Sequence, residues 1–444
     1  MESNICRTAT AASASSTAPA GLAPVAGIIL IPSPTGTFAD IGKLRGAARS
    51  FLHATASLPP RGQNRTEPIG QLQKTEASAR SKMLRLSAGS EKGIRLKLPM
   101  AAPSISAFPA QASHSPLTDS HGRVIHDLRV SITDRCNYKC VYCRTGEVGA
   151  QYPELALDEY LRLIGVFVAL GITKVRLTGG EPLLGRDVVD LVRELSRLRT
   201  LDGDKLDLAL TTNGHLLESL AQPLKDAGLN RITVSMDAVD AATFERITRV
   251  EGSFAKVLAG IRAARTAGLA PLKINCVLLR GFNDDQIEGF ARFAREEDVV
   301  VRFIEFMPLE EGRLWTPEIV VTLREIVDRI GRVLPLVELP PREASETARR
   351  YTFFDGVGEI GIIAPVSQAF CGACSRVRLT SDGKIRTCLF SQVEHDLYGR
   401  LRAGAGDDEL RTYIVQTIQE KEARHHIGEP GFLKPSRSMV HIGG

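Results

Sequence analysis

From about His121 onward, short runs of β-branched and apolar residues alternate with longer segments in which apolar residues recur at helical spacing. The short runs predict six strands: Val124–Ile132, Lys174–Leu177, Leu206–Thr211, Arg231–Ser235, Pro271–Leu278 and Val300–Phe306. The longer segments predict the helices between them: Leu157–Leu170, Asp187–Leu198, Leu216–Ala227, Ala241–Ile247, Phe254–Ala267 and Asp284–Glu296. Strands that alternate with helices form a parallel sheet with right-handed crossovers. The pattern therefore predicts an α/β fold with fewer strand–helix units than a complete barrel.

The pattern changes after a helix predicted near Leu323–Ile330. Prolines at 335, 340 and 341 mark a boundary, so we expect one domain over 119–335 and a small second domain over 336–444. Short strands are predicted in this second part at Arg350–Phe354, Glu359–Ala364, Arg376–Thr380 and Lys384–Leu389. A polar helix near Asp408–Arg424 and an irregular tail that closes on Gly443 and Gly444 complete the chain.

The first 118 residues are rich in Ala, Ser, Thr and Pro and show no lasting periodicity. They carry 13 Lys/Arg and 5 Asp/Glu, whereas the rest of the chain has a net charge of −3. This composition is typical of an organelle transit peptide followed by a disordered linker, and a disordered tail alone is the alternative. Because the basic excess lies in this leader, the body has no general nucleic-acid signature. No apolar stretch is long enough to predict a membrane span.

Six of the eight cysteines form two trios, whereas Cys6 and Cys276 stand alone. In the first trio Cys136, Cys140 and Cys143 follow directly on the first strand. Three thiolates at this spacing can hold three irons of a [4Fe–4S] cluster and leave the fourth iron open to a small molecule. A zinc site or a four-cysteine cluster is the alternative, but no further His or Cys follows until His215.

The second trio is Cys371, Cys374 and Cys388. Its spacing is compatible with zinc, for which His395 could be the fourth ligand, or with a second iron–sulfur cluster. Arg376 follows Cys374 by two residues, and Arg378 shares its face if the segment is a strand. Two guanidiniums beside an open iron favour an anionic ligand that also offers a donor atom to iron, so we favour the cluster.

Further basic residues occupy strand positions that are usually apolar inside a barrel. They are Arg129, Lys174, Arg176, Lys273 and Arg302. Any one of them could be a solvated residue at the rim. Together with the two arginines of the second trio they predict a polyphosphate pocket.

The first trio, with the aromatic Tyr142 before its last cysteine, resembles the signature of the radical S-adenosylmethionine superfamily. A Gly-Gly-Glu-Pro segment at 179–182 ends the second strand, as in that superfamily, where it contacts the methionyl amine. Its glycines permit close backbone approach, and Glu181 offers an anionic partner for an ammonium group. The resemblance implies reductive cleavage of S-adenosylmethionine to a 5′-deoxyadenosyl radical. It also implies the residues that line the cofactor site: Tyr142, Gly180, Glu181, Ser235 and Met307.

The chain from Val124 to Gly444 resembles one family more closely, the GTP 3′,8-cyclases that open molybdenum cofactor biosynthesis. The matching segments are Asp127–Asp134, Lys174–Pro182, Thr211–Gly214, Val234–Asp237, Arg302–Glu305, Glu359–Gly361, Cys374–Arg378, Cys388–Phe390 and Gly443–Gly444. The resemblance implies an incomplete (βα)6 TIM-like barrel of the radical SAM type with a small C-terminal α+β domain for an auxiliary cluster. The implied cofactors are two [4Fe–4S] clusters and S-adenosylmethionine.

In that family the radical abstracts the 3′ hydrogen of GTP, and the ribose radical attacks C8 of guanine to give (8S)-3′,8-cyclo-7,8-dihydroguanosine 5′-triphosphate. The second cluster holds the guanine, and the terminal Gly443-Gly444 enters the pocket to assist catalysis. The implied GTP-binding residues are Arg129, Lys174, Arg176, Thr211, Lys273, Arg302, Arg376, Val377 and Arg378.

The resemblance also implies partners and a compartment. These are an electron donor for cluster reduction and cyclic pyranopterin monophosphate synthase as the downstream enzyme, with no nucleic acid and no membrane; a homodimer is compatible with it. The leader, which the bacterial family members lack, suggests the mitochondrial matrix, with the plastid stroma as the alternative. A peptide-modifying radical maturase and a non-enzymatic zinc or iron–sulfur scaffold are the rival interpretations. Maturases usually carry more C-terminal cysteines.

Overall fold

The computed structural model describes residues 116–144 and 149–443. The predicted transit peptide and linker, apart from residues 116–118, lie outside the described residues, and so does Gly444. Within the described part, no helix is both long and apolar enough to cross a membrane.

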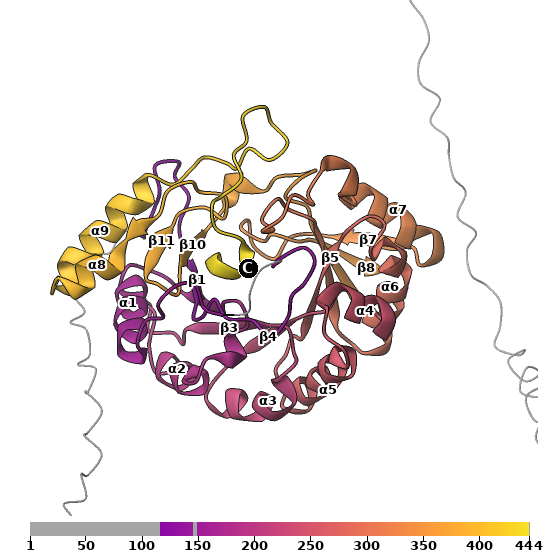
Figure 1. The fold of residues 1–444 in the computed structure, drawn as a ribbon, viewed down its shortest axis with the longest axis horizontal. Helices are drawn as coiled ribbons and strands as arrows, with labels where there is room; N and C mark the ends of the chain where they lie inside the picture. The colour runs from indigo at the N-terminus through magenta and orange to yellow at the C-terminus, as the bar shows by residue number, and fades with distance from the viewer. Residues whose placement is uncertain (1–115, 145–148, 444) are drawn as a thin grey trace, which may run out of the picture. The chain divides into compact units, whose positions relative to one another are not determined.

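Six parallel strands form the centre of the fold, and each lies beside the next in chain order. They are β1 Asp127–Ser131, β2 Lys174–Thr178, β3 Asp207–Thr212, β4 Arg231–Ser235, β5 Lys273–Leu278 and β6 Val300–Glu305. The helices on their outer side are α1 Leu157–Ala169, α2 Val188–Leu195, α3 Leu217–Asp226, α4 Ala241–Thr248, α5 Ser253–Thr266 and α6 Ile287–Glu296 (Figure 1). The predicted alternation of strands and helices is confirmed, with bounds that differ by a few residues.

The sheet extends beyond these six strands at both edges, and the C-terminal part of the chain supplies the extensions. Next to β6 lies the parallel strand β9 Glu359–Ile363, followed by the antiparallel strands β8 Arg349–Phe353 and β7 Leu336–Leu339. Next to β1 lies the parallel strand β10 Arg376–Leu379, followed by the antiparallel strands β11 Lys384–Arg386 and β12 His395–Asp396. The predicted second domain therefore continues the barrel sheet.

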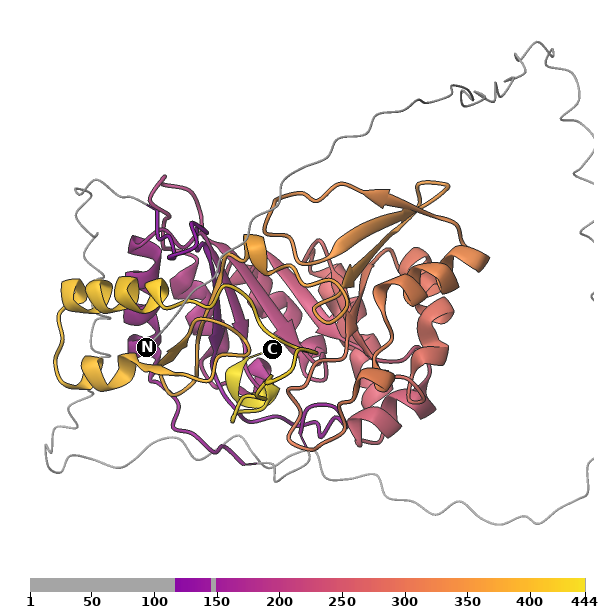
Figure 2. The ribbon, with the colours of Figure 1, turned by 90° about the horizontal axis from the view of Figure 1, so that it is seen from above.

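Three helices accompany these extensions: α7 Leu323–Val333, α8 Leu397–Arg402 and α9 Asp407–Gln419. Figure 2 shows α8 and α9 lying side by side, in contact with each other. The predicted helix 408–424 ends earlier than expected, and β7, β12 and α8 were not predicted. The prediction of an irregular tail was also wrong, because the tail contains a short helix, α10 Met439–Ile442. This helix lies inside the ring of elements in Figure 1.

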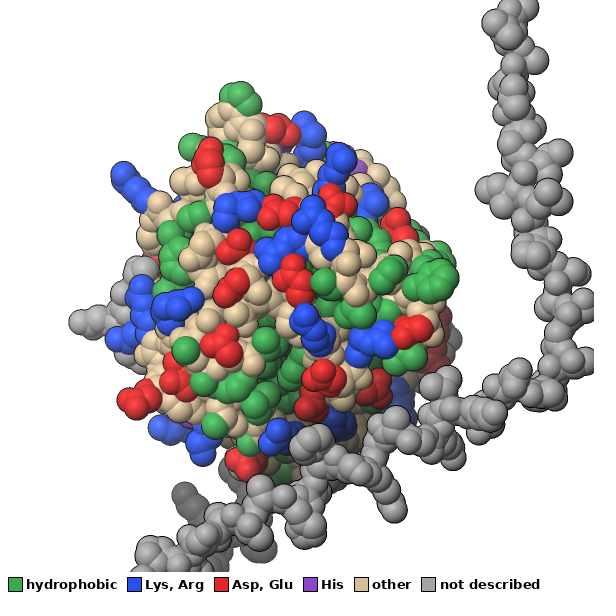
Figure 3. Space-filling view, turned by 90° about the vertical axis from the view of Figure 1, so that its right-hand side faces the viewer, with side chains coloured by type: hydrophobic (Ala, Val, Ile, Leu, Met, Phe, Trp, Pro, Cys, Tyr) green, Lys and Arg blue, Asp and Glu red, His purple; other side chains and the backbone are tan. Residues whose placement is uncertain are grey.

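The apolar core lies between the sheet and its outer helices. On β1 and β2, Leu128 and Val175 are fully buried, and α1 supplies Leu163 and Phe167 to the same core. Successive side chains of a strand point to opposite faces, so Arg129 and Arg176 point to the other side of the sheet. The face shown in Figure 3 carries basic and acidic side chains interspersed with apolar ones. Ion pairs such as Arg329–Glu288, with 2.8 Å between Nη2 and Oε2, are common on the exterior.

Candidate active site

The inner face of the sheet borders a cavity of about 590 Å³, a size suited to nucleotide-sized ligands. All six cysteines of the two trios line this cavity. So do the seven basic residues that the sequence predicted for a polyphosphate pocket. The cavity therefore joins groups that are separated along the chain by up to about 260 positions.

The first trio lies on the loop that follows β1, and its three cysteines are free thiols. The loop is held against the end of α4, because the backbone N–H of Lys139 donates to Thr248 at 3.1 Å and that of Val141 to Ile247 at 3.0 Å. Burial raises the pKa of Cys136 to about 11 and that of Cys143 to about 12. Thiols in such an environment ionise when a metal compensates the charge, which fits three ligands of a cluster.

Tyr142, inside this loop, lines the cavity and connects the trio to the barrel wall. Its hydroxyl donates to Oδ2 of Asp237 at 2.6 Å, and Oδ1 of Asp237 accepts from the backbone N–H of Val277 at 2.8 Å. Burial raises the pKa of Asp237 to about 6, although both hydrogen bonds act against the rise. This buried contact fixes the orientation of the loop.

The glycine segment after β2 approaches the cysteine loop closely. A Cβ on Gly180 would collide with the carbonyl group of Arg135, and the N–H of Gly180 donates to Thr133 at 2.7 Å. Gly180, Ser235 and Met307, which were predicted for the cofactor site, all line the cavity, and their contact with the cofactor stays a prediction. The close approach explains why this position holds a glycine.

Glu181 differs from the expectation. Its carboxylate is fully buried and accepts hydrogen bonds from the N–H groups of Leu183 at 2.9 Å and Asn213 at 2.7 Å and from the hydroxyl of Thr212 at 2.7 Å. Burial raises its pKa to about 7. Since its oxygens are engaged by the chain itself and it does not line the cavity, Glu181 supports the loop from behind, and the prediction that it meets an ammonium group is wrong.

The second trio lies around β10 and β11, which extend the sheet next to β1. Cys371 and Cys374 precede β10, which runs parallel to β1, so they lie at the opposite end of the strands from the loop that follows β1. Nη2 of Arg376 donates to Sγ of Cys374 at 3.2 Å. Burial tends to raise the pKa of Cys374, but Arg376 and Lys421 outweigh it and lower the pKa below its ordinary value. His395 does not line the cavity with this trio, and its ring lies 3.9 Å from Glu420 instead. The trio with its arginine fits a thiolate-bound cluster.

Strand register brings the predicted cations together. Arg129 is paired with Arg378 on one side and with Arg176 on the other, so three guanidiniums form a row across β10, β1 and β2. Burial and the neighbouring guanidiniums hold the pKa of Arg378 well below its ordinary value. On β5, burial and then Arg302 lower the pKa of Lys273 to about 8. These shifts show a positive cavity with few carboxylates to balance it, which favours a polyanion.

Thr211 and Val377, both predicted to bind GTP, lie in different environments. Thr211 lines the cavity and accepts a hydrogen bond from Nη1 of Arg176 at 3.3 Å. Val377 is fully buried in the core on the other face of β10, because it lies between two residues that face the cavity. The prediction that its side chain contacts a ligand in the cavity is therefore wrong.

Several cavity residues were not predicted from the sequence. Arg231 begins β4 just as Lys174 begins β2, so the same signal could have found it. His425 follows α9 in an irregular segment and packs against Phe390 with ring centroids 5.2 Å apart; no local pattern marked it. The unpredicted lining residues include Arg144, Arg231, Asn275, Arg342, Lys421 and His425.

The end of the chain also reaches the cavity. Met439 and Val440 line it, and the carbonyl of Gly443 accepts a hydrogen bond from Nη1 of Arg378. Gly443 has φ +73°, and a Cβ there would collide with the hydroxyl of Thr178. Gly443 therefore contacts a cation of the cavity wall, and only glycine fits this position. That the terminal glycines enter the pocket and assist catalysis stays a prediction.

Two family descriptions match most of the described chain. Residues 130–294 match the radical SAM superfamily, and residues 299–427 match the family described as Molybdenum Cofactor Synthesis C. The GTP 3′,8-cyclase of Moorella thermoacetica is 44% identical over 335 residues, which cover 74% of this chain and 100% of that protein. The GTP 3′,8-cyclase of Xanthomonas axonopodis pv. citri is 44% identical over 308 residues, 68% of this chain and 90% of that protein. Among solved structures, Streptococcus suis SuiB bound to S-adenosylmethionine is 14% identical with a TM-score of 0.47, covering 68% of this chain and 69% of that one.

Proposed function

The chain belongs to the GTP 3′,8-cyclase family of radical SAM enzymes, and from this premise we propose how its cavity performs the first step of molybdenum cofactor biosynthesis. The observation that carries the proposal is that both cysteine trios and seven basic residues line one cavity. A radical cluster alone would need only the first trio. A second thiol site beside a row of cations suits a substrate with a triphosphate at one end and a base at the other.

We assign Cys136, Cys140 and Cys143 to a [4Fe–4S] cluster and Tyr142, Gly180, Ser235 and Met307 to the walls of the S-adenosylmethionine site. With both groups bound, the site supplies the 5′-deoxyadenosyl radical that removes the 3′ hydrogen of GTP. The tight backbone turn at Gly180 holds the loop of the trio against the barrel. The three cysteines are partly exposed and line the cavity, so a bound cluster would be accessible to a ligand there.

The seven cations bind the triphosphate in this proposal. Arg129, Arg176 and Arg378 form one row by register, and Lys273 and Arg302 face them from β5 and β6. Their positions on strands are rigid, so the ribose is held at a fixed distance from the first trio. Cys371, Cys374 and Cys388 would hold a second [4Fe–4S] cluster that faces the guanine.

Anaerobic turnover tests this function. Protein with reconstituted clusters is mixed with dithionite, S-adenosylmethionine and GTP, and 5′-deoxyadenosine and cyclised nucleotide are measured by mass spectrometry. We expect both products, with deoxyadenosine formation dependent on GTP. Deoxyadenosine without conversion of GTP would show that the substrate is wrong.

Metal analysis tests the second cluster separately. A variant with serine at 371, 374 and 388 should lose about half of the iron, because the first trio remains. Zinc in the wild type that disappears in this variant would instead support a structural zinc site.

We also propose import into the mitochondrial matrix, supported by the basic, acid-poor leader. N-terminal sequencing of the protein from isolated organelles tests this, and an intact leader on organelle-free protein would contradict it. The electron donor, the downstream synthase and a homodimer stay predictions.

A further inference from the structure

The C-terminal tail, residues 437–443, connects the two cysteine trios. Val440 lines the cavity with Cys143, and its backbone N–H lies close enough to that thiol to act to lower its pKa. Three residues further on, the carbonyl of Gly443 accepts from Arg378, beside the second trio. The tail thus lies near a ligand of the first trio and binds a cation beside the second, so its placement affects both.

Apolar side chains pack against part of this tail. Ile442 is 1% exposed and packs in a cluster with Leu309, Phe390 and Ile427, and the N–H of Met439 donates to the carbonyl of Leu309 at 3.0 Å. Apolar contacts favour burial but have little directional preference. They do not by themselves fix which backbone group of the tail meets which partner in the cavity.

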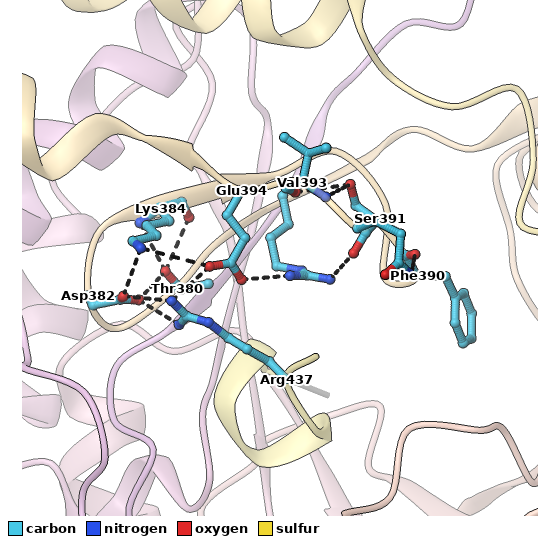
Figure 4. A network of polar contacts seen from close by, with 10 residues as sticks. Thr380, Asp382, Lys384, Phe390, Ser391, Val393, Glu394 and Arg437 are labelled. Atoms are coloured by element: carbon cyan, nitrogen blue, oxygen red, sulfur yellow. Dashed lines mark hydrogen bonds and ion pairs between the residues drawn. The ribbon is translucent and has the colours of Figure 1, made fainter. Parts of the chain in front are cut away.

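Directional contacts come from Arg437, just before α10. Its side chain is 5% exposed. Nη1 lies 2.9 Å from Oδ1 of Asp382, and Nη2 lies 2.8 Å from Oδ2 of Asp382 and 2.8 Å from Oε2 of Glu394 (Figure 4). A guanidinium gripped by two carboxylates has a fixed position and a fixed direction.

The two carboxylates are themselves anchored on the edge of the sheet. Asp382 lies in the turn between β10 and β11 and accepts from the hydroxyl of Thr380 at 2.6 Å. Glu394 accepts from Nη1 of Arg386 on β11 at 2.6 Å. Figure 4 shows these residues around the turn, with Arg437 reaching it from the tail. Burial opposes ionisation of Asp382, but hydrogen bonds from Arg437 and Thr380 hold its pKa below the ordinary value, so the pair is charged at neutral pH.

The anchor and the contact of the tail share one strand. β10 carries Arg378, which meets Gly443, and it leads into the turn that carries Asp382. The ring of Tyr152 adds a second support, because it lies 3.8 Å from the guanidinium carbon of Arg437 and packs edge-on against His441 with centroids 5.4 Å apart. The distance from the anchor to the cavity contact is therefore set by a rigid element and a short helix.

We propose that Arg437 is a positioning residue that sets the register of the C-terminal tail in the cavity, and so the position of Val440 near Cys143 and the contact of Gly443 with Arg378. This inference rests on the proposed function for its effect on turnover. Its structural part, the placement of the tail, can be measured without that function.

The first arm of the test measures placement. Hydrogen exchange of the tail amides is compared between reconstituted wild type, Arg437→Ala and Arg437→Lys. The alanine variant should exchange at least about tenfold faster at 438–443, while the lysine variant lies between, because it keeps the charge but grips only one carboxylate at a time. Arg329→Ala is the matched control, because it removes another two-pronged Arg–Glu pair, between α7 and α6, away from the tail. Unchanged exchange in Arg437→Ala would overturn the proposal.

The second arm is a double-mutant cycle on turnover. Arg437→Ala should lower kcat for GTP cyclisation by about tenfold or more and change KM for GTP by a smaller factor. The iron content and the electron paramagnetic resonance spectrum should stay unchanged. In a chain that lacks Gly443 and Gly444, the same substitution should change kcat by less than about twofold. A full loss in the truncated chain would show that Arg437 does not act through Gly443. Absence of cyclised product in the wild type would instead refute the proposed function, and the exchange arm would still decide the placement.

Discussion

Lys273 should make GTP binding depend on pH in a way that one substitution removes. Its ammonium lies on β5, facing a cavity with several guanidiniums. Burial, followed by repulsion from Arg302, Arg231, Arg342 and Arg176, lowers its pKa from 10.5 to about 8. This corresponds to about 3 kcal/mol of penalty on the charged form in the empty cavity. A bound triphosphate would remove much of the penalty and raise the pKa again.

The direction in which GTP affinity changes with pH follows from this difference between the pKa of Lys273 in the free and in the bound protein. Below pH 8 the lysine is already charged in the free protein, so binding takes up few protons. Above pH 8 the free lysine is neutral and binding must take up a proton, so affinity falls as pH rises. With a pKa of about 8 in the free state, proton uptake should be ~0.1 at pH 7, ~0.5 at pH 8 and ~0.9 at pH 9, and Kd should rise about tenfold from pH 7 to 9.

Anaerobic calorimetry of the reconstituted protein, in two buffers with different ionisation enthalpies, measures this uptake directly. Lys273→Arg keeps a cation that does not titrate in this range, so the uptake due to this residue should disappear. The ionisation of GTP itself is common to both proteins and cancels in the comparison. Lys225→Met, a change to a partly exposed lysine on α3 outside the cavity, serves as the control. Equal proton uptake by the wild type and Lys273→Arg would refute the reasoning.

Three further predictions concern the cavity wall. Cys140→Ser should abolish S-adenosylmethionine cleavage, because it removes one of three ligands; retained 5′-deoxyadenosine formation, measured by mass spectrometry, would contradict the assignment. Tyr142→Phe should lower the free energy of unfolding by ~1–3 kcal/mol, since Asp237 keeps only one of its two hydrogen bonds; an unchanged midpoint in denaturant unfolding followed by circular dichroism would count against it. Gly443→Ala should cut cyclised product about tenfold or more at unchanged iron content, because a Cβ collides with Thr178 at a positive φ; full turnover in the mass-spectrometric assay would show that the tail tolerates displacement.

Local patterns were sufficient for the parts of this protein that depend on neighbouring residues. The spacing of Cys136, Cys140 and Cys143 is a property of one loop, so it predicted a cluster site without the fold. The alternation along β2 likewise placed Lys174 and Arg176 on one face, because side chains alternate along any strand. The order of strands and helices followed from hydrophobic periodicity in the same way.

The sequence could not assign positions whose role depends on a distant partner. The sequence predicted that Glu181 offers its carboxylate to a ligand, but its oxygens accept hydrogen bonds from Leu183, Thr212 and Asn213. Thr212 and Asn213 lie at the end of another strand, β3. Val377 shared a motif with two arginines, and only the orientation of β10 shows that it faces the core. His395 had suitable chemistry for the second trio, yet it does not line the cavity with that trio.

The sequence by itself determined the chemistry of this protein: two thiol trios, a set of cations on strands, and a terminal diglycine. The tertiary structure decided how these groups meet. Arg129 lies between Arg176 and Arg378 because β10, formed late in the chain, pairs beside β1. Arg437 grips Asp382 across 55 positions of sequence. Periodicity records which face a residue occupies on its own element, whereas register and long-range ion pairs depend on the packing of elements against one another, which no local spacing encodes.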